Sequence, residues 1–298
     1  MALDDFTRRE RRKYLGSSDM AAICGLDPYR TAGDVWAEKT GRLGDRDLSN
    51  NPAVEVGEAI EPAILDWAEK KIAVPLERAA FFTREHLCAN VDGWGPSVPT
   101  LVEAKAMGIL GHPGYLAAFG DAGSDAVPEH VLIQTHHQIA VLAEGAGLVE
   151  LAYVAALLGG RGLVLFQIPR NPDLVDAILE RGEAFWVQHV ERDTPPPEAP
   201  SLPILKAMRR DATLAPVLLP RHLLVEWLAT KERRKDAEAL EEAAETVILH
   251  ALGDAMEGYV ADDPTLGQIK VLRFERRAYE VRAQTITQVR HVKARKER

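Results

Sequence analysis

The 298-residue sequence predicts an α/β (α+β) protein with a helical C-terminal extension. Within the first 195 residues, segments whose apolar residues repeat at the helical period of about 3.6 are interspersed with short strand-like runs. A proline-rich segment, "TPPPEAPSLP" from Thr194 to Pro203, has the composition of a linker. A long and heavily charged segment follows it. We therefore expect one domain over residues 1–195 and an extension over residues 196–298.

The first helices are indicated by capping residues and by apolar spacing. Asp19 is expected to cap a short helix that runs to Cys24, because an aspartate oxygen can accept from the free amides of a first turn. A second short helix is expected from Ala32 to Thr40. In "EVGEAIEPAILDWAEKK", from Glu55 to Lys71, apolar residues recur on one face, which predicts an amphipathic helix.

Strand-like sequence follows at Ala80–Thr83, His86–Asp92 and Thr100–Met107, with "GWGPSVP" joining the last two as a loop. Pro128 is expected to open a helix that runs to about Glu144.

The remaining elements are a hairpin and two helices. Leu151–Leu158 and Leu163–Ile168 are separated by "GGRG", which predicts a β-hairpin. Asn171 as N-cap and proline after it predict a helix that runs to Asp193. Beyond the linker we expect a helix over Arg221–Gly258. Two short strands, Ile269–Phe274 and Tyr279–Thr287, are expected after it.

Charge and cysteine content exclude several classes of protein. The formal net charge of −9 excludes a uniformly basic nucleic-acid surface, although a local basic patch remains open. The two cysteines, Cys24 and Cys88, are far apart and form no CxxC pair, which excludes a zinc ribbon and a four-cysteine iron–sulfur cluster. The sequence shows no secretory signal and no membrane-length apolar run, so we expect a cytoplasmic protein of a bacterial or phage-infected cell.

The stretch "VDGWGPSVPTLVEAK" gathers ionisable residues that would be costly to bury together. Asp92 closes one predicted strand, and Glu103 and Lys105 lie in the next. Residues i and i+2 of a strand point to the same side, so Glu103 and Lys105 enter one cleft, which Asp92 can reach if the two strands pair. Two carboxylates there would suit Mg²⁺, which would polarise a phosphodiester. The lysine would supply a positive charge for the attacking water or for the transition-state oxyanion.

The same pattern also fits a solvated hairpin with a salt bridge, and the neighbouring features have plain interpretations too. Glu61 would then be an exposed helix residue, and Gln134, in "VLIQTHHQIAV", an exposed or core amide. The "GSSD" turn that contains Ser18 would be a helix cap with solvated arginines before it.

The motifs occur in the order GSSD, PY, W-x-EKTG, G…E, DG, E-x-K and Q-x-x-HQ. This order resembles the YqaJ-type viral recombinase family, which is related to lambda exonuclease within the PD-(D/E)xK nuclease superfamily, over about residues 8–195. The resemblance implies a restriction-endonuclease-like core, with a central mixed sheet flanked by helices. It also implies Glu61, Asp92 and Glu103 as carboxylates for Mg²⁺, with Mn²⁺ as an alternative. Lys105 would be the catalytic lysine, and Gln134 the glutamine near the attacking water.

The resemblance further implies a site for the 5′-phosphate of DNA at Arg11 and Ser18. Arg12 competes with Arg11 for this role, and Ser17 competes with Ser18. After the E-x-K, this chain has "AMGILGHPGY" and no arginine, where related enzymes often place basic residues.

The expected function is a Mg²⁺-dependent exonuclease, acting 5′ to 3′ on the ends of linear double-stranded DNA. Its product would be a single strand for a phage-type annealing protein. An endonuclease or repair nuclease of the same superfamily, or a non-catalytic DNA-binding scaffold on this fold, are the alternatives. No membrane association is expected, and a homo-oligomer is left open.

Overall fold

The computed structural model describes residues 13–43, 52–108, 113–209, 213, 215–259 and 268–270. These residues divide into two compact units, the first ending in the region of Arg210 and the second starting after it. Arg11 and Arg12 lie outside the described residues. Each unit is described by itself.

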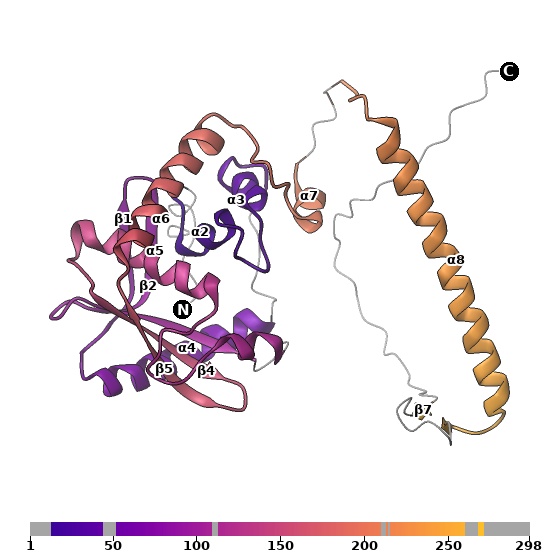
Figure 1. Cartoon of the computed structure of the whole chain (residues 1–298), viewed down its shortest axis with the longest axis horizontal. Helices are drawn as coiled ribbons and strands as arrows, with labels where there is room; N and C mark the ends of the chain where they lie inside the picture. Colours follow the sequence, from indigo (N-terminus) through magenta and orange to yellow (C-terminus); the bar gives the residue numbers. More distant parts are fainter. Residues whose placement is uncertain are drawn as a thin grey trace. The chain divides into compact units, whose positions relative to one another are not determined.

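The first unit is built on one mixed sheet of five strands in the order β1-β2-β3-β4-β5 (Figure 1). Neighbouring strands are antiparallel except β3 and β4, which run parallel and are connected through a helix. This sheet confirms the expected fold class. The strands are β1 (Glu77–Arg84), β2 (Leu87–Gly95), β3 (Thr100–Met107), β4 (Leu151–Leu158) and β5 (Gly162–Pro169).

Helices cover both faces of the sheet. In Figure 1, α4 lies on one side, and α5, α2 and α6 lie on the other. The helical elements are α2 (Ser17–Ile23), α3 (Ala32–Lys39), α4 (Pro52–Ile72), η1 (Pro113–Ala118), α5 (Glu129–Gly145), α6 (Pro172–Phe185), η2 (Trp186–Glu191) and α7 (Leu202–Ala207).

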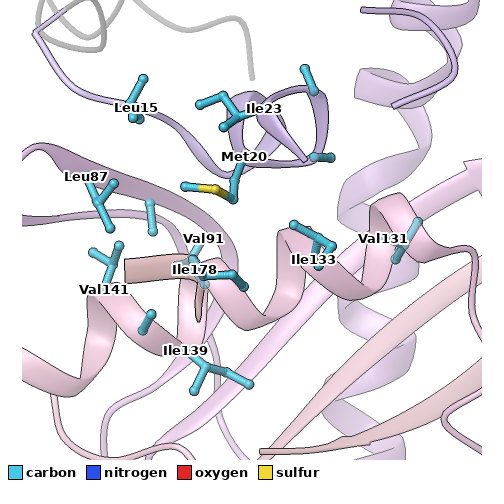
Figure 2. Packing of buried hydrophobic residues seen from close by; sticks show 14 of the residues in the cluster. Leu15, Met20, Ile23, Leu87, Val91, Val131, Ile133, Ile139, Val141 and Ile178 are labelled. Atoms are coloured by element: carbon cyan, nitrogen blue, oxygen red, sulfur yellow. The ribbon is translucent and has the colours of Figure 1, made fainter. Parts of the chain in front are cut away.

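The alternation of side chains along β3 divides the core into two parts. Val102 packs with Ile64 and Leu65 of α4, whereas Leu101 belongs to the larger cluster on the α5 side. Figure 2 shows Met20 of α2 pointing into that larger cluster. Gly182 lets α6 pack closely against this cluster, because a Cβ atom at residue 182 would lie only 2.8 Å from Leu87 and 3.0 Å from Met20. These contacts fix α5 over the strands that carry the candidate site.

Several element boundaries differ from the sequence expectation. Strand β2 continues through Trp94 to Gly95 because these residues still pair with β3, so the connecting loop is shorter than "GWGPSVP". Gly16, not Asp19, is the N-cap of α2, and the Asp19 carboxylate accepts from the Gly16 amide at 2.8 Å from within the first turn. Asn171 caps α6 as expected, but the helix changes to π geometry from Trp186.

The second unit consists of a long helix and a small antiparallel ribbon. Helix α8 (Arg221–Leu252) ends where Gly253 adopts a φ of 52°, earlier than the expected end at Gly258. Strand β6 (Glu257–Tyr259) pairs with β7 (Gln268–Lys270), which overlaps the first of the two expected strands. The second, over residues 279–287, lies outside the described residues.

The proline-rich segment makes contacts that a free linker would lack. It packs on the N-terminus of α3: the Thr31 hydroxyl donates to the Ala199 carbonyl at 3.0 Å, and the Ser201 amide donates to Asp34 Oδ1 at 2.6 Å. Composition alone concealed these contacts. The first compact unit therefore includes α7, beyond the expected boundary at residue 195.

Gly33 permits this packing, so Gly33→Ala should destabilise the first unit. A Cβ atom at residue 33 would lie 2.4–2.5 Å from the backbone of residues 198–200, so one chain segment must move. We expect a loss of about 1–3 kcal/mol in the free energy of unfolding and faster proteolysis near residues 194–203. Gly57→Ala in α4 is the matched control, because nothing lies within 4 Å of its Cβ position. Equal effects of the two substitutions would contradict this packing.

His137 should make the stability of the first unit dependent on pH. Its Nε2 lies 3.0 Å from the Cys88 carbonyl oxygen, no atom of the described part of the chain bonds to its Nδ1, and burial lowers its pKa to about 4. Because the folded state disfavours the charged ring, the stabilisation is complete above the ordinary histidine pKa and is lost as the pH falls toward 4. The difference amounts to about 3 kcal/mol at most. His137→Gln should flatten this part of the curve in urea unfolding between pH 7 and 4. Parallel curves for the two proteins would exclude the role.

Candidate active site

Asp92 and Glu103 lie beside each other at the end of the pairing between β2 and β3. The last residue pair of the β2–β3 ladder in this direction is Gly93 and Val102, so Asp92 and Glu103 are the next residues on the two strands. At this point a side chain replaces a main-chain acceptor of the sheet: Asp92 Oδ2 accepts a hydrogen bond from the Ala104 amide at 2.9 Å. The strand pairing on which the sequence prediction depended is therefore present.

Glu103 is the centre of a hydrogen-bonded cluster on the α5 side of the sheet. The residue is only 2% exposed. Its Oε1 accepts from Lys105 Nζ at 2.5 Å and from Gln134 Nε2 at 2.6 Å, and its Oε2 accepts from Gln138 Nε2 at 2.6 Å. Lys105 Nζ also donates to Gln134 Oε1 at 2.9 Å. A strand carboxylate and ammonium are thus held by two amides that lie one turn apart on α5.

The carboxylates around Lys105 are electrostatically crowded. Burial, and then the charge of Glu103, raise the pKa of Asp92 well above its usual value. Burial, with further contributions from Glu103 and Glu58, also raises the pKa of Glu61 on α4. Burial would lower the pKa of Lys105, but Glu103 and Asp92 outweigh it and raise that pKa. The crowding therefore favours protonation of Asp92 and Glu61, and an added cation would instead stabilise their ionised forms.

The donor set fits a magnesium ion. Asp92 and Glu103 supply hard carboxylate oxygens, and Mg²⁺ is commonly held by one or two carboxylates, with water and substrate oxygens completing its shell. Across the described ranges, no three His, Cys, Asp or Glu side chains already form a metal-ligand group. Glu61 on α4 affects the pKa values of Asp92 and Lys105, but it does not complete a three-residue metal-ligand group with Asp92 and Glu103.

A pocket of about 180 Å³ joins this cluster to the turn before α2. It brings Ser18 to the same cavity as Asp92 and Gln134, although the three residues come from different elements. The Ser17 hydroxyl is buried and has no hydrogen-bond partner among the residues that the structure describes. The lining residues are Gly16, Ser17, Ser18, Cys88, Asn90, Asp92 and Gln134.

Buried ion pairs support the turn on its other side. Asp19 Oδ2 lies 2.7 Å from Lys39 Nζ, and Asp19 Oδ1 lies 2.9 Å from Arg30 Nη1. Burial would raise the pKa of Asp19, but these two cations hold it well below its usual value. Arg30 also pairs with Glu38 at 2.6 Å. Arg30 is therefore a structural support of the turn.

The structure adds residues that the sequence did not single out for the site. Gln138 bonds directly to Glu103, and Asn90 lines the pocket two residues before Asp92 on β2. The spacing of four between Gln134 and Gln138 was the available signal, because it places both amides on one side of a helix. His137, in contrast, points away to the Cys88 carbonyl.

Comparisons with known proteins agree with the resemblance in the sequence. Residues 8–147 match the model of the YqaJ-like viral recombinase domain. A protein of Bacillus subtilis (strain 168), "Uncharacterized protein YqaJ", is 25% identical over 268 residues, which cover 85% of this chain and 79% of that protein.

Two solved structures are also similar. The alkaline exonuclease LHK-Exo of Laribacter hongkongensis has a TM-score of 0.49 at 15% identity, covering 62% of this chain and 91% of that chain. A phage related exonuclease of Haemophilus somnus 129PT has a TM-score of 0.45 at 14% identity, covering 61% and 96%. These scores are too low to transfer an activity. The family model is the comparison that bears on this chain: residues 8–147 are similar to the YqaJ-like viral recombinase domain.

Proposed function

We propose that this protein is a magnesium-dependent deoxyribonuclease that degrades linear double-stranded DNA from its ends. The single observation that carries the proposal is the cluster of Glu103, Lys105 and Gln134 beside Asp92. It combines two carboxylates for a metal, a lysine for developing charge and an amide for a water molecule, and Asp92 and Gln134 line one pocket. The family match and the expected order of motifs support the same reaction.

Asp92 and Glu103 would hold the metal, with Glu61 nearby. When bound, Mg²⁺ would neutralise the carboxylates and polarise the phosphodiester. Glu103 Oε1 accepts hydrogen bonds from Lys105 and Gln134. If Glu103 instead held the metal, the Lys105 ammonium and the Gln134 amide would become available to the substrate and to water. Lys105 would then stabilise charge that develops on the attacking or leaving oxygen, and Gln134 would orient the attacking water.

The pocket supports the finer proposal of action at DNA ends. Ser17 and Ser18 line the same cavity as Asp92, and within the described ranges no protein group bonds to the buried Ser17 hydroxyl. A 5′-phosphate offers strong acceptor oxygens for such hydroxyl groups. Resection from 5′ to 3′, with release of a single strand to an annealing protein for recombination, is the corresponding role. Arg11 remains the proposed cationic partner.

Lys105→Ala should abolish turnover while leaving DNA binding nearly intact, at some cost in stability because the buried Glu103 carboxylate loses its ammonium partner. The ammonium acts mainly on charge that develops in the transition state, and loss of one such group typically costs about 10²–10³ in rate. Digestion of end-labelled linear duplex, with magnesium and with chelator, measures the effect. Cleavage by the variant at the wild-type rate would remove Lys105 from the site.

Ser18→Ala should reduce the preference for 5′-phosphorylated ends more than it reduces cleavage itself. The wild-type protein should degrade phosphorylated linear duplex faster than duplex with 5′-hydroxyl ends. Testing Ser17→Ala in parallel shows which of the two serines is responsible for the preference. The substrates are matched duplexes that differ only in the terminal phosphate. Equal rates on both ends, or efficient cutting of closed circular duplex by the wild type, would favour the endonuclease alternative.

Gln138→Met should weaken activity by withdrawing the donor that positions Glu103 Oε2. Methionine has a similar shape but leaves that oxygen without its hydrogen bond, so we expect a higher magnesium requirement and a lower rate. Thr135→Val is the matched control on α5, because its hydroxyl donates only within the helix, to the Val131 carbonyl at 2.9 Å. The control should keep the wild-type magnesium requirement. A shared shift in both variants would show a general effect on α5 instead.

A further inference from the structure

Helix α5 carries a third polar side chain on the side that serves the candidate active site. His130 precedes Gln134 by four residues, as Gln134 precedes Gln138, so the three side chains lie on one side of the helix. Gln134 and Gln138 both bond to Glu103, and Gln134 also contacts Lys105. His130 therefore occupies the next position on this side, about 6 Å beyond Gln134 along the helix axis at 1.5 Å per residue.

The charges that act on His130 come from the candidate site and from the turn after α2. Burial lowers the pKa of its ring, the charge of Lys105 lowers that pKa further, and Asp27 acts in the opposite direction. Asp27 lies between α2 and α3, where its Oδ1 accepts a hydrogen bond from the Tyr29 amide at 2.7 Å. The half-buried ring of His130 therefore lies within electrostatic reach of both Lys105 and this turn.

The ring of His130 differs from the rings of the two other histidines of α5. His136 and His137 each use a ring nitrogen to bond to a backbone carbonyl, of Leu132 and of Cys88, and so support the fold. The His130 ring makes no hydrogen bond within the part of the chain that the structure describes. Because its pKa is lowered, the ring is neutral at neutral pH and offers one N–H donor. Such a donor suits an anionic oxygen and adds no further positive charge beside Lys105.

We infer that the His130 imidazole donates a hydrogen bond to a phosphodiester of the bound DNA, at the linkage that follows the scissile one on its 3′ side. This inference rests on the proposed nuclease function and adds a substrate contact to it. His130 is not among the residues that line the pocket with Ser17 and Ser18, so it meets the strand outside that pocket. A strand whose 5′ end enters the pocket continues only on the 3′ side of the scissile linkage.

The contact would fix the register of the strand in the site. Hydrogen bonds to DNA phosphates position a protein on the strand and carry no sequence information directly. Holding the following linkage would keep the scissile phosphodiester beside Asp92, Glu103 and Lys105. Because the following linkage does not change its charge during the reaction, the contact is equally strong in the ground state and the transition state. Its loss therefore weakens DNA binding and raises KM more than it lowers kcat.

Combining one substitution with one altered linkage tests the contact in the full-length chain. The substrate is a 5′-phosphorylated linear duplex with either a native phosphate or a neutral methylphosphonate at the second linkage from the 5′ end. Binding is measured with Ca²⁺ in place of Mg²⁺, and turnover as release of the labelled first nucleotide with Mg²⁺. On the native duplex, His130→Ala should weaken binding and raise KM by about 10–100-fold, as expected for a hydrogen bond to a charged group, with kcat nearly unchanged. On the methylphosphonate duplex, wild type and His130→Ala should bind almost equally, because the altered linkage has already removed the contact.

Two controls separate this contact from a general effect of the substitution. His130→Gln keeps an N–H donor and should recover part of the lost affinity. A methylphosphonate at the tenth linkage should leave the full difference between wild type and His130→Ala. The wild-type protein must itself lose affinity when the second linkage is altered, a result that does not depend on the folding of any variant.

The possible failures of the two proposals are distinguishable. Wild-type binding by His130→Ala, or a loss of the same size on native and altered second linkages, would overturn the role of His130 and leave the nuclease in place. A wild-type protein that binds the duplex with Ca²⁺ but does not cleave it with Mg²⁺ would overturn the proposed function. The comparison of binding on the two duplexes would still decide whether His130 contacts the second linkage.

Discussion

Burial of the Glu103 carboxylate is the constraint around which the candidate site is organised. An ionised carboxylate that is almost completely removed from water is costly unless charge and hydrogen bonds compensate it. Here one ammonium and two amides supply that compensation, from Lys105, Gln134 and Gln138. The same groups are the ones that a phosphodiester reaction would use. The interactions that stabilise the resting protein are thus those that the proposed metal would rearrange.

The fold provides these groups through two simple geometric rules. Strand alternation places Glu103 and Lys105 on one face of β3, and the helical turn places Gln134 and Gln138 above them on α5. The large apolar cluster between α5, α2, α6 and the sheet fixes the distance between the two elements. On the opposite side of the pocket, Asp19 and its two cations hold the turn that carries Ser18. Three separate parts of the sequence therefore meet in one cavity.

The sequence predicted those features that depend on local periodicity and failed where long-range contacts decide. The period of two in "LVEAK" was sufficient to place Glu103 and Lys105 on one face, and the N-cap at Asn171 was correct. Composition suggested a linker at Thr194–Pro203. The contact of this segment with the backbone at Gly33 is distant in sequence, so no local pattern shows it. Gln138 was passed over because a polar residue on a helix is more often solvated. Only the structure shows that Gln138 points to a buried carboxylate.

In the proposed site Lys105 and a metal compete for Glu103, and a calorimetric magnesium titration without DNA tests this competition most directly. Lys105→Met removes the positive charge that occupies Glu103 Oε1, so this variant should bind Mg²⁺ at least as tightly as the wild type. Glu103→Gln should bind it far more weakly, although the amide can still bond to its neighbours. Wild-type magnesium affinity in Glu103→Gln, or loss of affinity in Lys105→Met, would contradict the account.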